Sequence, residues 1–201
     1  MHQIVIASKN PGKIREIRNF LHGLNIELKS IEDFPEIPEI QEIKEDGNTF
    51  EENAFKKAKI VYDYSKITTI ADDSGLEVIH LNNKPGILSK RYSGPNANDL
   101  TNNQQLLSDL KDVDMDDRKA RFKCVIVLYN SLYNGINFEG KCEGYVIDEM
   151  KGENGFGYDP LFVPLGYNKT FAELDLVTKN KISHRGRALT HLRTFLERTF
   201  K

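Results

Sequence analysis

Long hydrophobic runs are absent from this chain of 201 residues. Apolar stretches such as residues 4–7 and 124–129 are far shorter than the roughly 20 residues that a bilayer-spanning helix needs. The opening segment MHQIVIASKN has neither the basic flank nor the apolar length of a signal peptide. We therefore expect no export signal and no membrane partner.

Cysteine is scarce, because only Cys124 and Cys142 occur. Two cysteines make no disulfide framework, and without an export signal they predict a cytoplasmic protein. The formal net charge is only −2, with acids and bases interspersed. That balance argues against a protein that coats nucleic acid by charge, so we expect no nucleic-acid partner, but it leaves room for a local basic pocket.

Repeats, low-complexity tracts and interdomain linkers are also missing, and the sequence predicts a single domain over residues 1–201. Strand-like and helix-like segments alternate in the first half of the chain. The second half contains a hairpin signal, Asn134-Gly135, between two β-prone segments. This combination predicts an α/β protein with a mixed sheet rather than a purely parallel one.

Several helix boundaries can be predicted from the sequence. Asn10 is expected to cap a helix that begins at Pro11 and stops near Gly23. The TFEE segment forms a capping box, which predicts a second helix from Thr49 with Glu52 reaching back. Between these two helices, residues 32–48 are acidic, contain two prolines and are expected to form an extended connector.

The last helix is expected to begin near Ser183. Four apolar residues recur along it at helical spacing and are predicted to face inward. They are Leu189, Leu192, Leu196 and Phe200.

Two adjacent carboxylates, Asp72 and Asp73, follow an apolar run in the segment TTIADDSGLEV. Residues 67–73 are predicted to be a strand. Asp accepts hydrogen bonds from nearby backbone N–H groups, so one interpretation is a solvated turn at the end of that strand. The alternative is a magnesium site, because Mg²⁺ prefers carboxylate oxygens.

The junction ASKNPGK joins the first predicted strand to the first predicted helix. Backbone N–H groups and the helix dipole make such a junction suitable for an anion, with Lys13 one turn inside and Ser8 and Asn10 able to donate. Phosphate-loop and dinucleotide fingerprints are absent, since Lys13 is followed by Ile14 rather than Ser or Thr. Phosphate binding and a plain helix cap are both open here.

Lys57 is predicted to lie on the apolar stripe of the second helix, because a turn of about 100° per residue returns it almost to the direction of Phe50. Lys56 and Lys59 project away. The Lys57 stem could run along the surface, or its ammonium could face an anion in a cleft. Two acids precede this helix: Glu45 and Asp46.

Two further segments combine unusual residues. GENGFGYDPLF, residues 152–162, could present Phe156 and Tyr158 to a ligand or could simply be a turn with a core phenylalanine. KNKISHRGRAL crowds cations at the start of the last helix, although cations favour helix C-termini. An anionic or keto-bearing ligand would explain that placement. The cations are Lys179, Lys181, His184, Arg185 and Arg187.

Six motifs in order, SKNPGK, TFEENAFKKA, ADDSGL, PGILSKRYSG, GENGFGYDPLF and SHRGRAL, make the whole chain resemble the inosine/xanthosine triphosphate pyrophosphatase family. One departure is that the family commonly has an aromatic residue and an alanine where this chain has Leu88 and Lys90. The resemblance implies a long mixed β-sheet flanked by helices, with two lobes around a central active-site cleft, and a homodimer.

The resemblance also implies roles for residues. Asp73 would be the proton acceptor. Glu45 and Asp73 would hold Mg²⁺, with Asp72 as a further candidate ligand. The triphosphate would be bound by Ser8, Asn10, Lys13 and Lys57, and substrate would also contact Ser74. The nucleoside would be contacted by Phe156, Gly157, Tyr158, Asp159, Lys179, His184 and Arg185.

The implied reaction is Mg²⁺-dependent hydrolysis of ITP, dITP or XTP to the nucleoside monophosphate and pyrophosphate, which cleanses the nucleotide pool. Donors from His184 or Arg185 would favour the 6-keto group of these bases over the 6-amino group of adenine. One alternative is a pyrophosphohydrolase for other modified or pyrimidine nucleotides. Another is a non-catalytic nucleotide-binding or RNA-binding module.

Overall fold

The computed structural model describes residues 2–41 and 43–199. The chain forms two compact units, each built from separate segments. The first unit comprises Met1–Asp73, Cys124–Glu139 and Gly186–Lys201. The second comprises Ser74–Lys123 and Gly140–Arg185.

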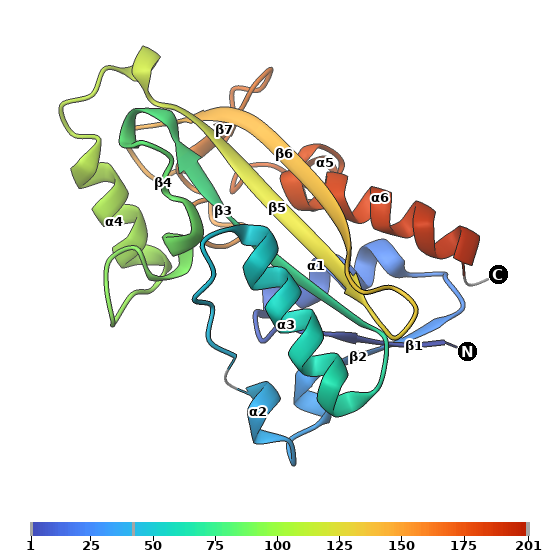
Figure 1. Cartoon of the computed structure of the whole chain (residues 1–201). Coiled ribbons are helices and arrows are strands. Elements are labelled where there is room, and N and C mark those ends of the chain that lie inside the picture. Colours follow the sequence, from blue (N-terminus) through green and yellow to red (C-terminus); the bar gives the residue numbers. More distant parts are fainter. Residues whose placement is uncertain (1, 42, 200–201) are drawn as a thin grey trace. The chain divides into compact units, whose positions relative to one another are not determined.

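The strands form one mixed sheet, as predicted. The sheet has seven strands in the order β2-β1-β3-β5-β6-β7, with β4 paired to β3 (Figure 1). β1 is parallel to β2 and β3, whereas the pairs β3·β4 and β6·β7 are antiparallel. The strands are β1 His2–Ile6, β2 Ile26–Ser30, β3 Thr69–Val78, β4 Lys84–Pro85, β5 Lys119–Tyr129, β6 Ile136–Val146 and β7 Phe162–Pro164. The helices are α1 Pro11–Leu21, α2 Pro38–Gln41, α3 Phe50–Ser65, α4 Asp99–Asp109, α5 Leu176–Ile182 and α6 His184–Thr199.

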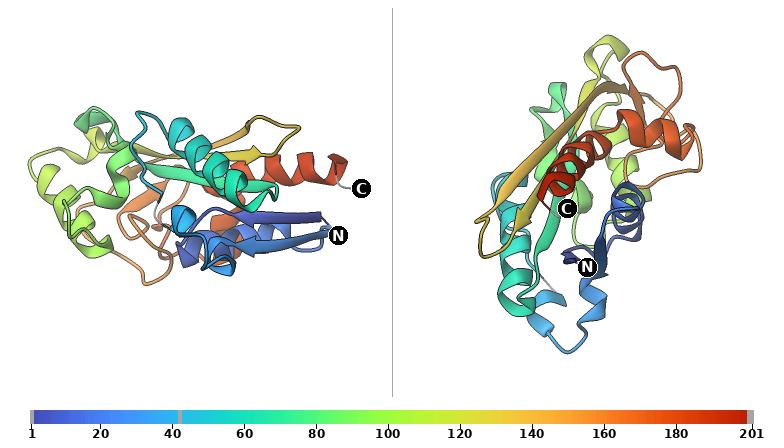
Figure 2. Two further views of the ribbon diagram at one scale, coloured as in Figure 1. Left: turned by 60° about the horizontal axis from the view of Figure 1, so that its bottom comes forward. Right: turned by 90° about the vertical axis from the view of Figure 1, so that its right-hand side faces the viewer.

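In the first unit, α1 and α6 cover one face of the strands and α3 covers the other (Figure 2). Alternation along each strand explains this arrangement, because successive side chains point to opposite faces. Ile4, Ile70 and Ile126 pack with Leu189 against the α1–α6 side. The inward positions of Leu189, Leu192 and Leu196 are thus confirmed, while Phe200 lies outside the described residues.

The predicted helix starts are confirmed. Asn10 caps α1, since its side chain accepts from the Lys13 N–H at 3.0 Å. Thr49 caps α3 by accepting from the Glu52 N–H at 3.0 Å. The Glu52 carboxylate reaches back to the N–H of Asn48 at 2.7 Å, one residue before the cap. Both helices therefore start where side chains replace the missing intrahelical partners.

One prediction about a connecting segment needs correction. The extended connector over residues 32–48 is interrupted by α2, which begins at Pro38 and buries Ile40 completely. The predicted start of the last helix near Ser183 is confirmed, because α6 begins at His184. A further short helix that was not predicted, α5, precedes it and ends just before Ser183, whose backbone is extended.

The second unit has its own core around aromatic rings. Phe122 lies edge-on to Phe162, with ring centroids 4.8 Å apart, and stacks on Phe171 at 5.8 Å. Leu76 from β3 and Leu106 from α4 belong to the same cluster. Among the described residues, no helix combines the length and apolar character needed to cross a membrane.

Candidate active site

Asp72 and Asp73 lie within β3, a continuous strand of 10 residues, and not at its end. Their exposed fractions are 1% and 6%. The interpretation as a solvated turn is therefore wrong. Local preference for a turn at Asp-Asp-Ser-Gly yields to strand pairing on both sides of the acids.

The two neighbouring carboxylates point in different directions, as strand alternation requires. Asp72 Oδ1 lies 3.1 Å from the Lys13 Nζ of α1, and the Cys124 Sγ of β5 lies 3.9 Å from Asp72 Oδ2. Asp73 Oδ2 instead accepts from Asn53 Nδ2 of α3 at 3.0 Å. Each acid is thus engaged with a different helix of the first unit.

Lys57 joins the carboxylates on the α3 side. Its Nζ donates to Glu45 Oε1 at 2.5 Å and to the Asp72 backbone carbonyl at 2.7 Å, and lies 3.8 Å from Asp73 Oδ1. The residue is 7% exposed, so its predicted place on the buried stripe of α3 is confirmed. Lys56 instead forms an exposed pair with Asp46.

Burial and charge act in opposite directions on this cluster. Burial alone would lower the pKa of Lys57, but Asp73, Glu45 and Asp72 outweigh it, so the pKa lies above its ordinary value of 10.5. Burial raises the pKa of Asp73 above its ordinary value of 3.8, although Lys57 and Lys13 oppose that shift. Two lysines and three carboxylates thus share a poorly solvated site in which each charge depends on its neighbours.

The predicted phosphate loop precedes α1. Asn10 Oδ1 serves as the helix cap, and the Ser8 hydroxyl oxygen accepts from the Asn10 N–H at 3.2 Å. The Asn10 side chain keeps an Nδ2 group that can donate, while Lys13 extends from the first turn to Asp72. The loop therefore has the cap of an ordinary helix and, in addition, a cation directed at the acids.

The oxygen ligands in this cluster suit a hard cation. Across residues 2–41 and 43–199, no group of three or more His, Cys, Asp and Glu side chains is gathered as a protein-only metal cage. Mg²⁺ does not need one, because it commonly uses one or two carboxylates and completes its shell with water and substrate phosphates. Glu45 and Asp73, both beside Lys57, fit that requirement.

In the second unit, three of the predicted nucleoside-contacting residues lie at Phe156: Asp159, Lys179 and Arg185. Lys179 Nζ lies 2.7 Å from Asp159 Oδ2, and both residues are buried. The same carboxylate oxygen accepts from the Phe156 N–H at 2.8 Å. Lys179 Nζ is 5.0 Å from the Phe156 ring centroid and Arg185 Cζ is 5.4 Å from it, so two cations are within cation–π range of the half-buried ring.

The start of α6 is anchored within this unit. Arg185 Nη2 donates to Ser74 Oγ at 2.8 Å. The His184 ring stacks on Phe122, with centroids 4.6 Å apart and planes 9° from parallel. His184 and Arg185 are 4% and 2% exposed. Both side chains at this helix start therefore have partners within the unit, and Arg185 also lies close to Phe156.

The aromatic loop is held by α4. Gly157 donates its N–H to Asp99 Oδ2 at 2.7 Å, and its carbonyl accepts from Asn103 Nδ2 at 2.8 Å. Tyr158 is buried and donates its hydroxyl to the Ser89 carbonyl at 2.9 Å. Of the two aromatic residues predicted to face a ligand, Tyr158 packs in the core and Phe156 keeps a partly exposed ring.

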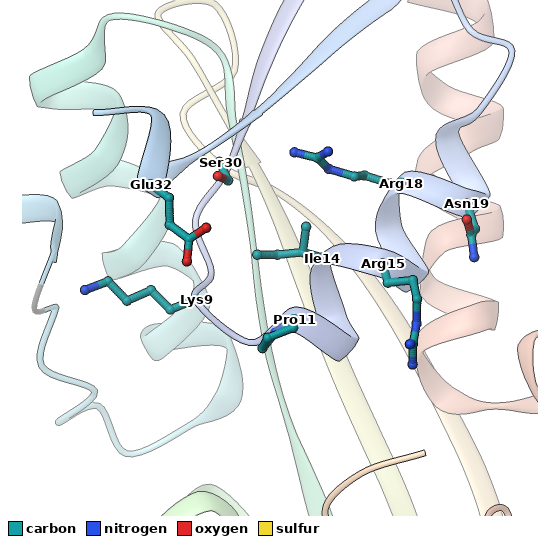
Figure 3. Close-up of a pocket in the computed structure, with 8 residues that line it drawn as sticks. All are labelled: Lys9, Pro11, Ile14, Arg15, Arg18, Asn19, Ser30 and Glu32. Carbon is teal, nitrogen blue, oxygen red and sulfur yellow. The ribbon is translucent and has the colours of Figure 1, made fainter. Parts of the chain in front are cut away.

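A separate pocket of about 400 Å³ lies beside α1 in the first unit (Figure 3). Arg15 and Arg18 of α1 line one side of it, and Lys9 and Glu32 lie on the other side. None of the predicted site residues lines this pocket. It therefore adjoins the phosphate loop without including Ser8, Asn10 or Lys13.

Sequence reasoning missed the residues that support the predicted site. Asn53 holds Asp73, Phe122 stacks on His184, and Asp99 and Asn103 hold Gly157. Asn53 could have been found, because it falls on the same buried stripe of α3 as Lys57. The other three contacts join segments far apart in the chain and leave no local signal.

Comparison with known proteins gives the family. A model of the Ham1 family matches residues 4–195. The chain belongs to the Ham1 family. The predicted resemblance is confirmed by proteins named dITP/XTP pyrophosphatase, one from Geobacter sulfurreducens and one from Clostridium perfringens.

These Ham1 family relatives match along nearly their full length. The Geobacter sulfurreducens protein is 47% identical, with 98% of this chain and 97% of that protein covered. The Clostridium perfringens protein is 45% identical, with 100% of both covered. The solved structure of a HAM1 protein from Coxiella burnetii is 40% identical, has a TM-score of 0.89 and covers 98% of this chain and 100% of that one. The predicted fold class, a mixed sheet with flanking helices, is therefore confirmed.

Proposed function

We propose that this chain is a Mg²⁺-dependent pyrophosphatase that hydrolyses ITP, dITP and XTP to the nucleoside monophosphate and pyrophosphate. Relatives named dITP/XTP pyrophosphatase, similar over nearly the whole chain, support this substrate class. The observation that carries the proposal is the cluster in which the buried Lys57 meets the buried Asp73 and the half-buried Glu45. Buried opposite charges of this kind suit a ligand that is both polyanionic and metal-bound.

In the proposed reaction, water attacks the α-phosphorus, an oxygen–phosphorus bond forms, and the bond between the α-phosphorus and the bridging oxygen breaks. Asp73 orients the water and accepts its proton. A triphosphate carries about four negative charges near neutral pH, so it needs cations around it. Lys13, Lys57, Ser8 and Asn10 bind these phosphates, and the lysines stabilise the charge that develops on the leaving pyrophosphate.

Glu45 and Asp73 would hold the magnesium ion. The ion, when bound, supplies positive charge that stabilises the departing pyrophosphate. Asp72 is less suited to the same ion, because strand alternation directs it to Lys13 on the α1 side. We assign it to orienting Lys13.

We propose that the second unit recognises the base. Lys179 and Arg185 supply donors near the Phe156 ring, and Asp159 and Ser74 hold these two side chains in place. His184, next to Arg185 at the start of α6, is a further donor in this proposal. A 6-keto base accepts from such donors, whereas adenine would leave them unpaired. Gly157 and Tyr158 shape the loop that carries the ring.

A substrate panel tests the proposal. Pyrophosphate release should be measured for ITP, XTP, dITP, GTP, ATP and dTTP, with Mg²⁺ and with a chelator. We expect kcat/KM for ITP, XTP and dITP to exceed that for ATP by about 100-fold or more, and release to stop with the chelator. Equal rates for ITP and ATP would refute the base preference, and nucleotide binding without turnover would favour a binding module.

The cytoplasmic location and the homodimer are further parts of this proposal. They follow from the two cysteines and from the family resemblance described above. Cell fractionation tests the location. Light scattering of the purified chain tests the dimer, for which a mass near twice 23.0 kDa is expected.

A further inference from the structure

Asn53 is a buried polar residue on α3 with 1% of its surface exposed. It shares the inward stripe of that helix with Phe50, Ala54 and Lys57, and it precedes Lys57 by one helical turn. A buried amide is costly to retain unless its donor and acceptor are both satisfied. The partners of Asn53 therefore indicate what it does.

Those partners are Asp73 and Gly47. Asn53 Oδ1 accepts from the Gly47 N–H at 2.8 Å, and Asn53 Nδ2 donates to Asp73 Oδ2 at 3.0 Å. The Gly47 backbone nitrogen can only donate, so the amide oxygen must face it and the NH₂ group must face Asp73. This pattern removes the usual ambiguity in the orientation of an asparagine amide.

Gly47 fits closely against Asn53. A Cβ atom at this position would lie 2.8 Å from Asn53 Oδ1 and 2.9 Å from Glu52 Cβ, which is closer than carbon atoms approach such neighbours. Glycine therefore lets the loop backbone come within hydrogen-bonding distance of the amide. Glu45 lies two residues before Gly47 in the same loop.

We propose that Asn53 is a positioning residue that fixes the rotation of the Asp73 carboxylate and ties it to the loop carrying Glu45. The terminal torsion of an aspartate is broad, so a hydrogen bond is needed to select one orientation. Through one amide, the two carboxylates assigned to Mg²⁺ keep a constant relation. This inference rests on the proposed function, because it assigns Asp73 and Glu45 a shared task.

Two substitutions separate the two hydrogen bonds. Asn53→Leu has a similar size and removes both. Asn53→Asp keeps an acceptor for the Gly47 N–H but replaces the donor to Asp73 with a carboxylate. We expect kcat for dITP with Mg²⁺ to fall by about 10- to 100-fold in both variants. KM should change by less than about threefold, because Asn53 is not among the residues proposed to bind the triphosphate.

Thr49→Ala is the matched control. It removes the cap of the same helix without touching Asp73, and we expect a melting temperature lower by about 2–4 °C with kcat near that of the wild type. Hydrogen exchange at the Gly47 amide, measured on the metal-free chain, should be fast in Asn53→Leu and slow in Asn53→Asp. Calorimetric titration with Mn²⁺ should show weaker binding in both Asn53 variants and unchanged binding in Thr49→Ala.

Three results would overturn the inference. Wild-type kcat in Asn53→Asp would mean that only the Gly47 contact matters. An equal loss in Thr49→Ala would mean that helix stability explains the effect, and unchanged exchange at Gly47 in Asn53→Leu would contradict the contact itself. Failure of the proposed function looks different: the wild type would then release no pyrophosphate from dITP, while the exchange and Mn²⁺ measurements would still test the geometry.

Discussion

The first and second units hold their buried charges in different ways. In the first unit, Lys13 of α1 contacts Asp72 directly, and Lys57 of α3 lies beside both Glu45 and Asp73. In the second unit, Asp159 pairs with Lys179, whose Nζ lies 5.0 Å from the Phe156 ring centroid and 5.8 Å from that of Phe171. The first arrangement suits a charged ligand, which can replace the carboxylates as the ionic partner of these lysines. The second suits a planar ligand placed near rings and fixed donors.

The largest effect is expected from Asp73→Asn in the first unit. The change keeps the size of the side chain but removes its charge and its ability to accept a proton. We expect kcat for dITP to fall by about 1,000-fold, within the range for a lost general base. Single-turnover release of pyrophosphate checks this, with the exposed Asp63→Asn as the control. Turnover within about tenfold of wild type would remove Asp73 from the chemistry.

Lys57→Met should give the largest loss of stability. It leaves Glu45 and Asp73 without their shared cation, and breaking a buried charged pair costs about 3–5 kcal/mol. The pKa of Lys57 is raised on folding, so its contribution is complete below pH 10.5 and disappears as the pH rises through the higher folded value. The difference from wild type in free energy of unfolding should thus be constant near neutrality and shrink in strong alkali.

Denaturant unfolding at several pH values measures that difference. Lys59→Met is the control, because Lys59 and Asp63 form an exposed pair on the same helix. We expect the control to unfold nearly as the wild type does. A Lys57 effect no greater than that of Lys59 would contradict the structural role of the buried charge.

The division of labour between the units is tested by Lys13→Ala and His184→Ala. Removing the lysine should weaken binding of ITP, GTP and ATP alike by about 10- to 100-fold, because charge-assisted contacts to phosphate are lost. Removing the histidine should reduce the preference for ITP over ATP. Competition binding with all three nucleotides gives the ratios. If both variants lost affinity equally for every base, the two clusters would not have separate tasks.

The smallest effect is expected from Phe156→Leu. Leucine keeps an apolar side chain but removes the negative ring face near Lys179 and Arg185. A cation–π contact contributes about 0.5–2 kcal/mol, so kcat/KM for ITP should fall by about 2- to 30-fold. Phe156→Tyr keeps the ring and should recover most of the loss. No recovery would mean that shape rather than the ring face matters.

Interactions between residues close in the sequence made part of the first unit predictable. Asn10 and Thr49 act as caps in the structure as the sequence indicates, because a cap needs only neighbours along the chain. Lys57 was found by helical periodicity for the same reason. The strand at Asp72 and Asp73 was not found in full, since its continuation depends on pairing with distant segments.

The second unit was less predictable in its contacts. The residues around Phe156 were selected from composition and resemblance, but no spacing connects Phe122 with His184 or Asp99 with Gly157. The residues in each contact lie far apart in the sequence, and Asp99 and Gly157, for example, are separated by 58 positions. They meet only when the chain has folded. Sequence periodicity identifies faces of elements and does not identify which faces meet.

The segmented chain path of the first unit has a consequence for folding during synthesis. Its core cluster takes side chains from β1 and α1 at one end of the chain and from α6 at the other. The second unit is complete in sequence at Arg185, whereas the first still lacks α6 at that point. Contacts between segments so far apart in the chain form slowly. The core that surrounds β3 in the first unit is therefore completed only after α6 has been synthesised. A nascent chain that ends just after Arg185 therefore contains every residue of the second unit, whereas the first unit still lacks the α6 side chains of its core.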